Sequence, residues 1–378
     1  MNDRPPVVFV GNARCYHTMD WCRSVHPCLR KGSWVFFTDC VESENHLRII
    51  TTEDRVRLLL PIDRLLLNQQ SAKADRWRNL LKFLLLPLQA LALRLRLGDC
   101  RGRIIHAHTL YYALTCRMAG VRYLFTPQGG ELTERPYRSR LYRGLMRSAL
   151  VGARFSFVDS ERMRQAAIEL GCKAVAIFQY GIDTTSCRAS DLRKPRWRLL
   201  SNRGIEANYR IEAIQRARDL ERPDLPLTFF YPLWDLPYHQ SFSKRLRPRD
   251  EDLGRIAKAR CYELYAEARL VISIPVSDSS PRSVYEAIFC GAPVVTTASR
   301  WVDDLPASMR CRVLLVDPDR AGWLEQALVW ADDCLHIPFM PCAEAIARYD
   351  QYGVARSIYE RFYRPVLEPQ GLPVSIES

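Results

Sequence analysis

Short runs of consecutive apolar residues, separated by segments with the periodicity of an amphipathic helix, repeat along the first half of the sequence. The helical periodicity is clear at residues 136–150 and 160–170. Strands that are apolar throughout are buried on both faces, which is typical of a parallel sheet covered by helices. The first half therefore predicts an α/β domain, with strands at residues 7–10, 34–37, 103–108, 122–126, 155–160 and 174–178.

The same pattern starts again after a polar and basic stretch. Residues 189–198 (ASDLRKPRWR) are interrupted by Pro195, and they indicate a linker. Further apolar runs with helices between them follow at residues 198–203, 227–232, 270–275, 293–297 and 312–316. We therefore predict two Rossmann-like halves in tandem, and no membrane-spanning segment is visible.

Composition narrows the class of protein. A chain of 378 residues is long enough for two α/β domains, and its 48% of hydrophobic residues indicates a globular protein. An apolar run begins already at residue 7, so we expect no signal peptide. The thirteen cysteines form no Cys-x-x-Cys pair. We therefore expect reduced thiols and a cytoplasmic location.

The formal net charge of +13, carried mainly by arginine, predicts an anionic partner or a simple basic surface. Anionic lipid, a phosphorylated substrate and nucleic acid all fit this charge. No helix-turn-helix, zinc-finger or aromatic RNA-binding motif accompanies the arginines, which argues against nucleic acid. A nicotinamide-dependent oxidoreductase is also disfavoured, because the first predicted strand is followed by the single glycine Gly11 instead of Gly-x-Gly-x-x-Gly.

Ligands of open α/β sheets bind outside the carboxyl ends of the strands. The chemistry-bearing residues at these ends are Gly11, His106, His108 and the run 128–131 in the first half, and Arg203 and the segment 277–295 in the second.

These segments resemble retaining glycosyltransferases of family 4. Residues 106–132 (HAHTLYYALTCRMAGVRYLFTPQGGEL) resemble the family's N-domain, as does Gly181-Ile182-Asp183. Residues 277–295 (SDSSPRSVYEAIFCGAPVV) resemble its paired-acid motif, in which two glutamates separated by seven residues precede a Gly-x-Pro-Val-Val run. Asp278 stands here in place of the first glutamate, and Glu286 matches the second.

The resemblance implies the GT-B fold, an α/β fold of two Rossmann-like domains that face each other across a cleft. In that fold a C-terminal helix, here expected at 353–366, crosses back to the N-domain. The expected parts are therefore an acceptor-side domain at 1–188, a nucleotide-sugar domain at 189–352, and a returning C-terminal segment at 353–378.

The paired-acid segment suits a sugar nucleotide. Glu286, one turn inside a helix, can accept both ribose hydroxyls in charge-assisted hydrogen bonds. The loop from Ser279 to Val284 leads into the start of that helix, whose free N–H groups can receive the diphosphate. Asp278, before the loop, can meet the hydroxyls of the transferred sugar. The competing interpretation makes Asp278 a loop cap and Glu286 a solvated helix residue. The residues that we assign to the donor are Gly11, Arg203, Arg210, Ser279, Ser283, Val284 and Glu286.

Two departures from the family pattern affect the expected chemistry. An arginine and a lysine clamp the diphosphate in the family. Arg203 matches the arginine, whereas Tyr209 stands at the lysine position, and Arg210 beside it is either the substitute for the lysine or a surface cation. Gln128 stands where many members carry a histidine. Transfer of this type is described as front-face substitution that needs no protein nucleophile, so we keep Asp278 and Gln128 as the catalytic candidates.

The acceptor side is less well defined by the sequence. Glu131 suits either an acceptor contact or a helix cap, His17 either an acceptor contact or the start of a helix, and His108, like His106, either a site residue or a buried strand end. The acceptor-side candidates are His17, His108, Gly129, Gly130 and Glu131.

Residues 74–97 (ADRWRNLLKFLLLPLQALALRLRL) form a leucine-rich segment with basic flanks. Its apolar core of eleven residues is too short to cross a bilayer. The flanks Arg76, Arg78, Lys82, Arg94 and Arg96 suit a helix that lies on an anionic membrane surface, and a core helix of the N-domain is the alternative.

The resemblance and the residues together predict a retaining, metal-independent hexosyltransferase without a cofactor. It would move a sugar from a nucleotide-sugar to a glycan or a polyprenyl-diphosphate-linked acceptor, in polysaccharide or glycolipid synthesis. We expect a cytoplasmic protein, peripheral on the inner face of the membrane, with no nucleic-acid partner. A sugar-nucleotide epimerase of the same fold and a catalytically degenerate binding protein remain alternatives.

Overall fold

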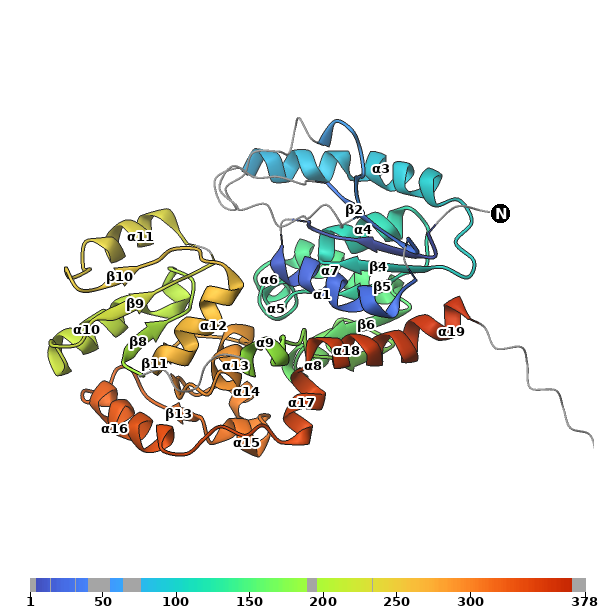
Figure 1. Cartoon of the computed structure of the whole chain (residues 1–378). Helices are drawn as coiled ribbons and strands as arrows, with labels where there is room; N and C mark the ends of the chain where they lie inside the picture. Colours follow the sequence, from blue (N-terminus) through green and yellow to red (C-terminus); the bar gives the residue numbers. More distant parts are fainter. Residues whose placement is uncertain are drawn as a thin grey trace, which may run out of the picture. The chain divides into compact units, whose positions relative to one another are not determined.

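The computed structural model divides the chain into two compact units. The first unit comprises residues 1–180 and 352–378, and the second comprises residues 181–351 (Figure 1). The sequence predicted the boundary eight residues later, and residues 189–195 of the predicted linker lie outside the described residues. The structure describes residues 5–13, 15–30, 32–39, 55–63, 76–188, 196–232 and 234–368.

A seven-stranded parallel sheet forms the centre of the first unit. Its strand order is β3-β2-β1-β4-β5-β6-β7, and β1 pairs with β2 on one side and with β4 on the other. The strands are β1 (Val7–Val10), β2 (Trp34–Thr38), β3 (Val56–Leu58), β4 (Ile104–His108), β5 (Leu124–Thr126), β6 (Phe155–Val158) and β7 (Val175–Ile177). The sequence missed β3 because this edge strand is only partly buried and carries an exposed arginine at its centre.

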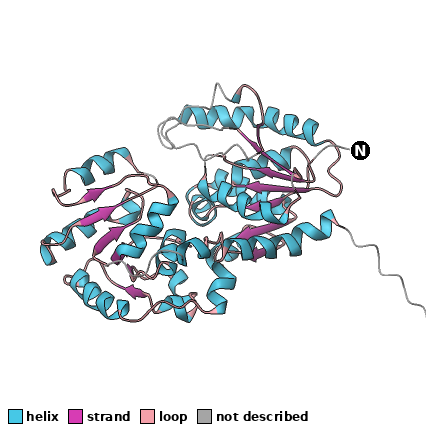
Figure 2. Cartoon of the chain, viewed as in Figure 1, coloured by secondary structure: helices cyan, strands magenta, loops and turns pink. Residues whose placement is uncertain are grey.

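Helices cover both faces of this sheet, and Figure 2 shows them in cyan around the magenta strands. One face packs against α3, α4, α7 and α8, and the other packs against α1 and the C-terminal helices. The helices are α1 (Tyr16–Val25), α3 (Arg76–Leu97), α4 (Leu110–Met118), α5 (Gly129–Thr133), α6 (Arg135–Arg138), α7 (Arg140–Gly152), α8 (Glu161–Glu169), α18 (Gln351–Ile358) and α19 (Arg364–Leu367), with a 3₁₀ turn at His26–Cys28 and a π-helical turn, η3, at Tyr359–Tyr363.

The C-terminal helices return to the first unit, as the fold class predicted. Val354, Ala355 and Ile358 of α18 are buried in the same cluster as Phe9 of β1. The hydroxyl of Tyr363 forms a hydrogen bond of 2.6 Å with Nδ1 of the buried His106.

A six-stranded parallel sheet forms the centre of the second unit, in the order β10-β9-β8-β11-β12-β13. The strands are β8 (Arg198–Ser201), β9 (Leu227–Phe229), β10 (Glu251–Asp252), β11 (Ala268–Ser273), β12 (Val294–Thr296) and β13 (Val313–Leu315). Its helices are α9 (Thr184–Arg188), α10 (Ile211–Glu221), α11 (Leu236–Ser243), α12 (Lys258–Glu267), α13 (Arg282–Phe289), α14 (Arg300–Asp303), α15 (Ala307–Arg310), α16 (Trp323–Leu335) and α17 (Ala343–Tyr349), with a 3₁₀ turn, η2, at Ala207–Tyr209.

The chain enters and leaves the second unit at neighbouring positions. Ile182 bridges to Asp350, and the N–H of Gln351 donates to the carbonyl of Ile182 at 2.8 Å. Gly181 has a φ of +73°, and a Cβ there would lie 2.4 Å from the Cα of Gln351. Glycine is therefore required at this position by both its backbone conformation and the close approach of the second segment.

Candidate functional site

The loops that follow β8 and β11 meet at the carboxyl edge of the second sheet. The two strands are neighbours and run parallel, so both loops emerge on the same side. Asn202, directly after β8, donates from its amide to the hydroxyl of Tyr265 at 2.9 Å and to the carbonyl of Ser283 at 3.1 Å. This pair of hydrogen bonds fixes the β8 loop against the start of α13.

Arg203 is the centre of this arrangement. Its guanidinium donates to the Ser283 hydroxyl at 2.9 Å and forms an ion pair with Asp278. It also lies over the ring of Tyr209, 4.5 Å from the centroid. Burial would lower the pKa of Arg203, but Asp278 and Tyr209 hold it above its usual value. The structure thus brings together Arg203, Asp278 and Ser283, three residues that the sequence predicted.

The first turn of α13 adjoins this cluster. The helix begins after Pro281 without a side-chain cap and has no acidic residue in its first turn. Val284 differs from Ser283, because its side chain is fully buried in the core and its N–H donates to the carbonyl of Pro281 at 2.9 Å. Ser279 lies in the preceding loop and is partly buried. Of the loop, Ser279 and Ser283 are therefore better placed for a ligand than Val284.

Glu286 is buried one turn further along α13, and its environment was not predicted. Its Oε1 forms an ion pair with Nζ of Lys258 at the start of α12, and the Nε of Arg282 lies 3.6 Å from the same oxygen. The Glu286 side chain is 3% exposed, whereas that of Lys258 is 47% exposed. Lys258 therefore has room to leave the carboxylate when a ligand approaches.

The structure places Tyr209, and not Arg210, against Arg203. Tyr209 ends η2 and its ring forms the cation–π contact described above. Arg210 adopts the left-handed conformation, with φ 50° and ψ 42°, at the start of α10. A non-glycine residue in this conformation is uncommon and marks a constrained loop.

In the first unit, Gln128 and three of the predicted acceptor-side residues, Gly129, Gly130 and Glu131, follow β5. Gln128 and Glu131 form a capping box at the start of α5, and the Gln128 amide donates to Sγ of Cys15 at 3.2 Å. The Glu131 carboxylate also accepts the N–H of Leu110 at 3.1 Å, and burial raises its pKa. Glu131 thus caps two helices, which is one of the two roles that the sequence left open. A Cβ on Gly130 would meet no atom within 4 Å, so the backbone there is open to a ligand.

The residues at the ends of β1 and β4 are closely packed. A Cβ on Gly11 would lie 2.9 Å from Cγ2 of Thr18 and 3.3 Å from Cβ of His108, so packing alone accounts for this glycine. His108 is buried beside Trp21, with ring centroids 4.8 Å apart, and burial lowers its pKa to about 3. His108 is therefore neutral and enclosed. His17 is exposed in α1, and its ring lies 5.7 Å from that of Tyr180.

A polar cluster at the end of β2 was missed by the sequence analysis. Asp39 follows this strand directly and is fully buried; it accepts the Tyr112 hydroxyl and forms a 2.5 Å ion pair with Lys82 of α3. The position of an acidic residue after a buried strand was the signal that could have identified it. The sequence analysis counted Lys82 among the basic residues that would face an anionic membrane. The structure corrects this assignment, because the Lys82 side chain points to Asp39.

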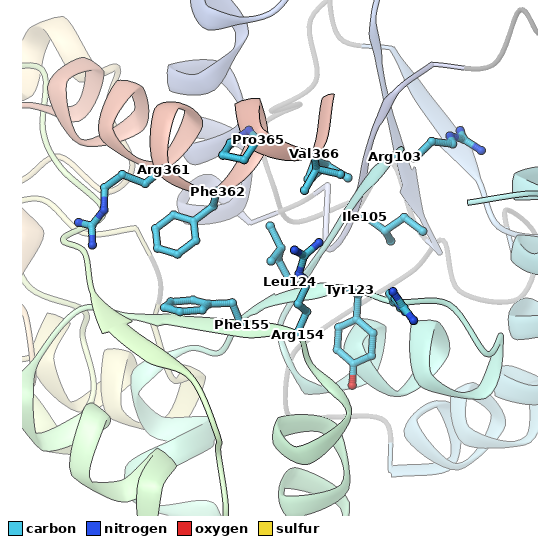
Figure 3. Close-up of a pocket in the computed structure, with 12 residues that line it drawn as sticks. Arg103, Ile105, Tyr123, Leu124, Arg154, Phe155, Arg361, Phe362, Pro365 and Val366 are labelled. Atoms are coloured by element: carbon cyan, nitrogen blue, oxygen red, sulfur yellow. The ribbon is translucent and has the colours of Figure 1, made fainter. Parts of the chain in front are cut away.

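A separate cavity of about 200 Å³ lies at the amino ends of β4, β5 and β6 (Figure 3). Arg154 extends toward its centre, whereas Arg103 donates to the carbonyls of Pro5 and Leu97. Its lining comprises Arg103, Ile104, Ile105, Arg122, Tyr123, Leu124, Arg154, Phe155, Arg361, Phe362, Pro365 and Val366. This is the edge opposite to the one where ligands of open α/β sheets bind, so we do not include it in the candidate site.

Within the described part of the chain, no group of three or more His, Cys, Asp or Glu side chains is arranged to hold a metal ion. None of the described helices is both long and apolar enough to cross a membrane.

Solved structures similar to this chain include sugar-phosphate synthases and a protein crystallised with UDP and glucose. The HepE protein of Anabaena, crystallised with UDP and glucose, has a TM-score of 0.68 at 14% identity, over 94% of this chain and 99% of that chain. Sucrose-phosphate synthase of Thermosynechococcus elongatus has a TM-score of 0.69 at 14% identity, over 97% of this chain and 100% of that chain. A UDP-forming trehalose-phosphate synthase of Burkholderia xenovorans has a TM-score of 0.63 at 14% identity, over 96% of this chain and 98% of that chain. No family model and no curated protein matches the sequence.

The chain has the GT-B fold. At this level of identity the likeness shows the fold alone, and the two parallel sheets of seven and six strands agree with it.

Proposed function

We propose that this GT-B protein is a retaining glycosyltransferase of the family 4 type, which moves a hexose from a nucleotide-sugar to a carbohydrate or lipid-linked glycan. The observation that carries the proposal is the meeting of Arg203, Asp278 and Ser283 beside the uncapped start of α13. A guanidinium, a hydroxyl and the positive end of a helix dipole suit a diphosphate. A carboxylate beside them suits the hydroxyls of a sugar.

The similar structures support UDP as the first nucleotide to test. HepE was crystallised with UDP, and the Burkholderia synthase is described as UDP-forming. We further propose that the protein acts in polysaccharide or glycolipid synthesis in the cytoplasm. It would need no cofactor and bind no nucleic acid.

A thermal-shift screen of the full chain against UDP, GDP, ADP and CMP tests the donor class. A ligand at one hundred times its Kd stabilises the folded state by roughly 2.7 kcal/mol. We therefore expect one nucleoside diphosphate, UDP first, to raise the melting temperature by several degrees, and CMP to leave it unchanged. If none of the four raises it, the proposed donor site is wrong.

A nucleotide-binding protein without turnover is the second candidate, and one contact favours it. Gln128 stands at the position of the family's histidine, and its side-chain amide is hydrogen-bonded to Sγ of Cys15. Product analysis with UDP-sugars separates the candidates, because a transferase releases UDP and an epimerase interconverts two UDP-sugars. The binding protein does neither, although UDP still raises its melting temperature.

We predict that turnover does not require a divalent metal. Arg203 and the positive end of the α13 dipole supply positive charge for the leaving diphosphate, and we assign Asp278 and Glu286 to hydroxyls. Excess EDTA should leave the rate of sugar transfer unchanged. A rate that falls with EDTA and returns with Mg²⁺ or Mn²⁺ would contradict this prediction.

A further inference from the structure

Helix α3 has two apolar faces, of which the described residues cover only one. Leu86, Ala90, Leu93 and Leu97 are buried in the core on one face of the first sheet. The opposite side carries five leucines with 55–69% of their surface exposed. These are Leu80, Leu84, Leu88, Leu91 and Leu95, which we call the α3 leucine face.

The spacing of the leucine face makes it one continuous surface. Leu80, Leu84, Leu88, Leu91 and Leu95 follow one another at intervals of three or four residues, so they lie along one side of the helix. Figure 1 shows α3 on the outside of its unit, and α4 is the helix that packs beneath it. Scattered exposed leucines are ordinary in globular proteins, whereas a contiguous stripe indicates an interaction surface.

The polar side chains of α3 that face inward hold the helix in its unit. Lys82 forms an ion pair with the buried Asp39. Gln89 donates to Asp63 at 3.0 Å and accepts the hydroxyl of Tyr111 at 2.5 Å. If α3 left these partners and entered a bilayer, a buried carboxylate would be exposed to the apolar acyl chains. Helix α3 can therefore lie on a bilayer but cannot enter it lengthwise.

The charge of α3 identifies the occupant. Residues 76–97 contain five basic residues and no acidic one. With Lys82 occupied by Asp39, the remaining basic residues stand at the two ends of the helix, and Arg94 is exposed. An apolar face between basic ends matches an anionic bilayer, in which acyl chains lie beneath negatively charged headgroups. A protein partner would not require this combination.

We propose that the α3 leucine face lies in the headgroup and acyl boundary of an anionic membrane. The inference resolves the two alternatives left by the sequence, because α3 is a core helix on one side and a membrane-surface helix on the other. The membrane proposal deepens the proposed function and rests on it, because a lipid-linked acceptor is expected only if the protein is a glycosyltransferase. Asp39, to which α3 is tied, stands at the carboxyl end of β2, and that edge of the sheet is where the acceptor would bind.

Cosedimentation of the full chain with vesicles tests this proposal. We expect the wild-type protein to pellet with phosphatidylglycerol–phosphatidylcholine vesicles in low salt. Binding should fall at least tenfold with phosphatidylcholine alone and at least tenfold in 1 M NaCl, because the shorter Debye length screens the basic ends. The triple variant Leu84→Ser, Leu88→Ser, Leu91→Ser should lose at least tenfold of the binding to anionic vesicles.

A matched control replaces three equally exposed apolar residues of the second unit by serine. Leu220, Val329 and Ile337 are 78%, 58% and 69% exposed, and their replacement should leave vesicle binding unchanged. A second variant, Arg76→Ser with Arg78→Ser and Arg94→Ser, keeps the leucines and tests the charge if the leucine variant does not fold. Lys82 is left in place in both variants because of its ion pair with Asp39.

The outcomes separate the possible occupants of the face. If the wild-type protein ignores anionic vesicles, the membrane proposal is overturned. It is also overturned if the wild type is a dimer that the leucine variant converts to a monomer, since the face then belongs to a second copy. The response of the melting temperature to UDP is measured in the same preparations, so a failed donor site and a failed membrane site are distinguishable.

Discussion

Replacing Glu286 by alanine should abolish the preference of the protein for a nucleotide with intact ribose hydroxyls. We expect UDP to bind about tenfold to 150-fold more weakly, which corresponds to a loss of roughly 1.5–3 kcal/mol for charge-assisted hydrogen bonds. The physical reason is that Glu286 is the buried carboxylate one turn inside α13 that we assign to these hydroxyls. Calorimetry with UDP and with 2′,3′-dideoxy-UDP measures the preference directly.

The matched control for this prediction is Lys258→Met, which breaks the same ion pair but keeps the carboxylate. Lys258 occupies Oε1 of Glu286. If the lysine competes with ribose for this oxygen, the Lys258→Met variant should keep the preference for UDP over the dideoxy compound and bind UDP at least as tightly as the wild type. A Glu286→Ala protein that still folds and still prefers UDP would show that the carboxylate only holds α12 to α13.

The strands show how far the fold could be predicted from the sequence. Central strands such as β1 are apolar throughout because both faces are covered, and their pattern is visible without any structure. The edge strands β3 and β10 were missed. An edge strand has fewer neighbours to exclude water, so its sequence can be polar, and β10 consists of Glu251 and Asp252.

The candidate site was predictable where its residues are close in the sequence or, like Arg203, stand at the end of a predicted strand. Asp278, Ser283 and Glu286 lie on one loop and helix, so their spacing could be interpreted directly. The partners of these residues come from elsewhere: Lys258 precedes Glu286 by 28 positions and reaches it only because α12 packs against α13. The side-chain contacts between two packed helices depend on the whole sheet, and no local pattern encodes them.

Helix α3 shows a different limit of sequence periodicity. Its apolar residues lie on nearly all sides, so the pattern indicates neither which side is buried nor which is exposed. The buried side is chosen by contacts with α4 and by the ties of Lys82 and Gln89 to aspartates far away in the sequence. The two interpretations offered by the sequence were therefore not exclusive.

Replacing Asp278 by asparagine is expected to lower the rate of sugar transfer by roughly a hundredfold, because we assign this carboxylate to hydroxyls of the transferred sugar in the transition state. UDP contains no such sugar, so its affinity should change by less than about threefold. The structure offers a competing role, since Asp278 also forms an ion pair with Arg203. If that pair only positions the guanidinium, Asp278→Asn should weaken UDP binding as strongly as it slows transfer.

The comparison with Arg203→Met decides between these two roles of Asp278. Removing the guanidinium should weaken UDP binding and leave the binding of uridine unchanged, because uridine has no diphosphate for Arg203 to contact. Asp278→Asn should leave both nucleotide affinities near those of the wild type, and it should even favour UDP slightly, since the buried Arg203 then lacks its counter-charge. Equal losses of turnover and of UDP affinity in Asp278→Asn would assign this residue to the positioning of Arg203 and remove it from the sugar.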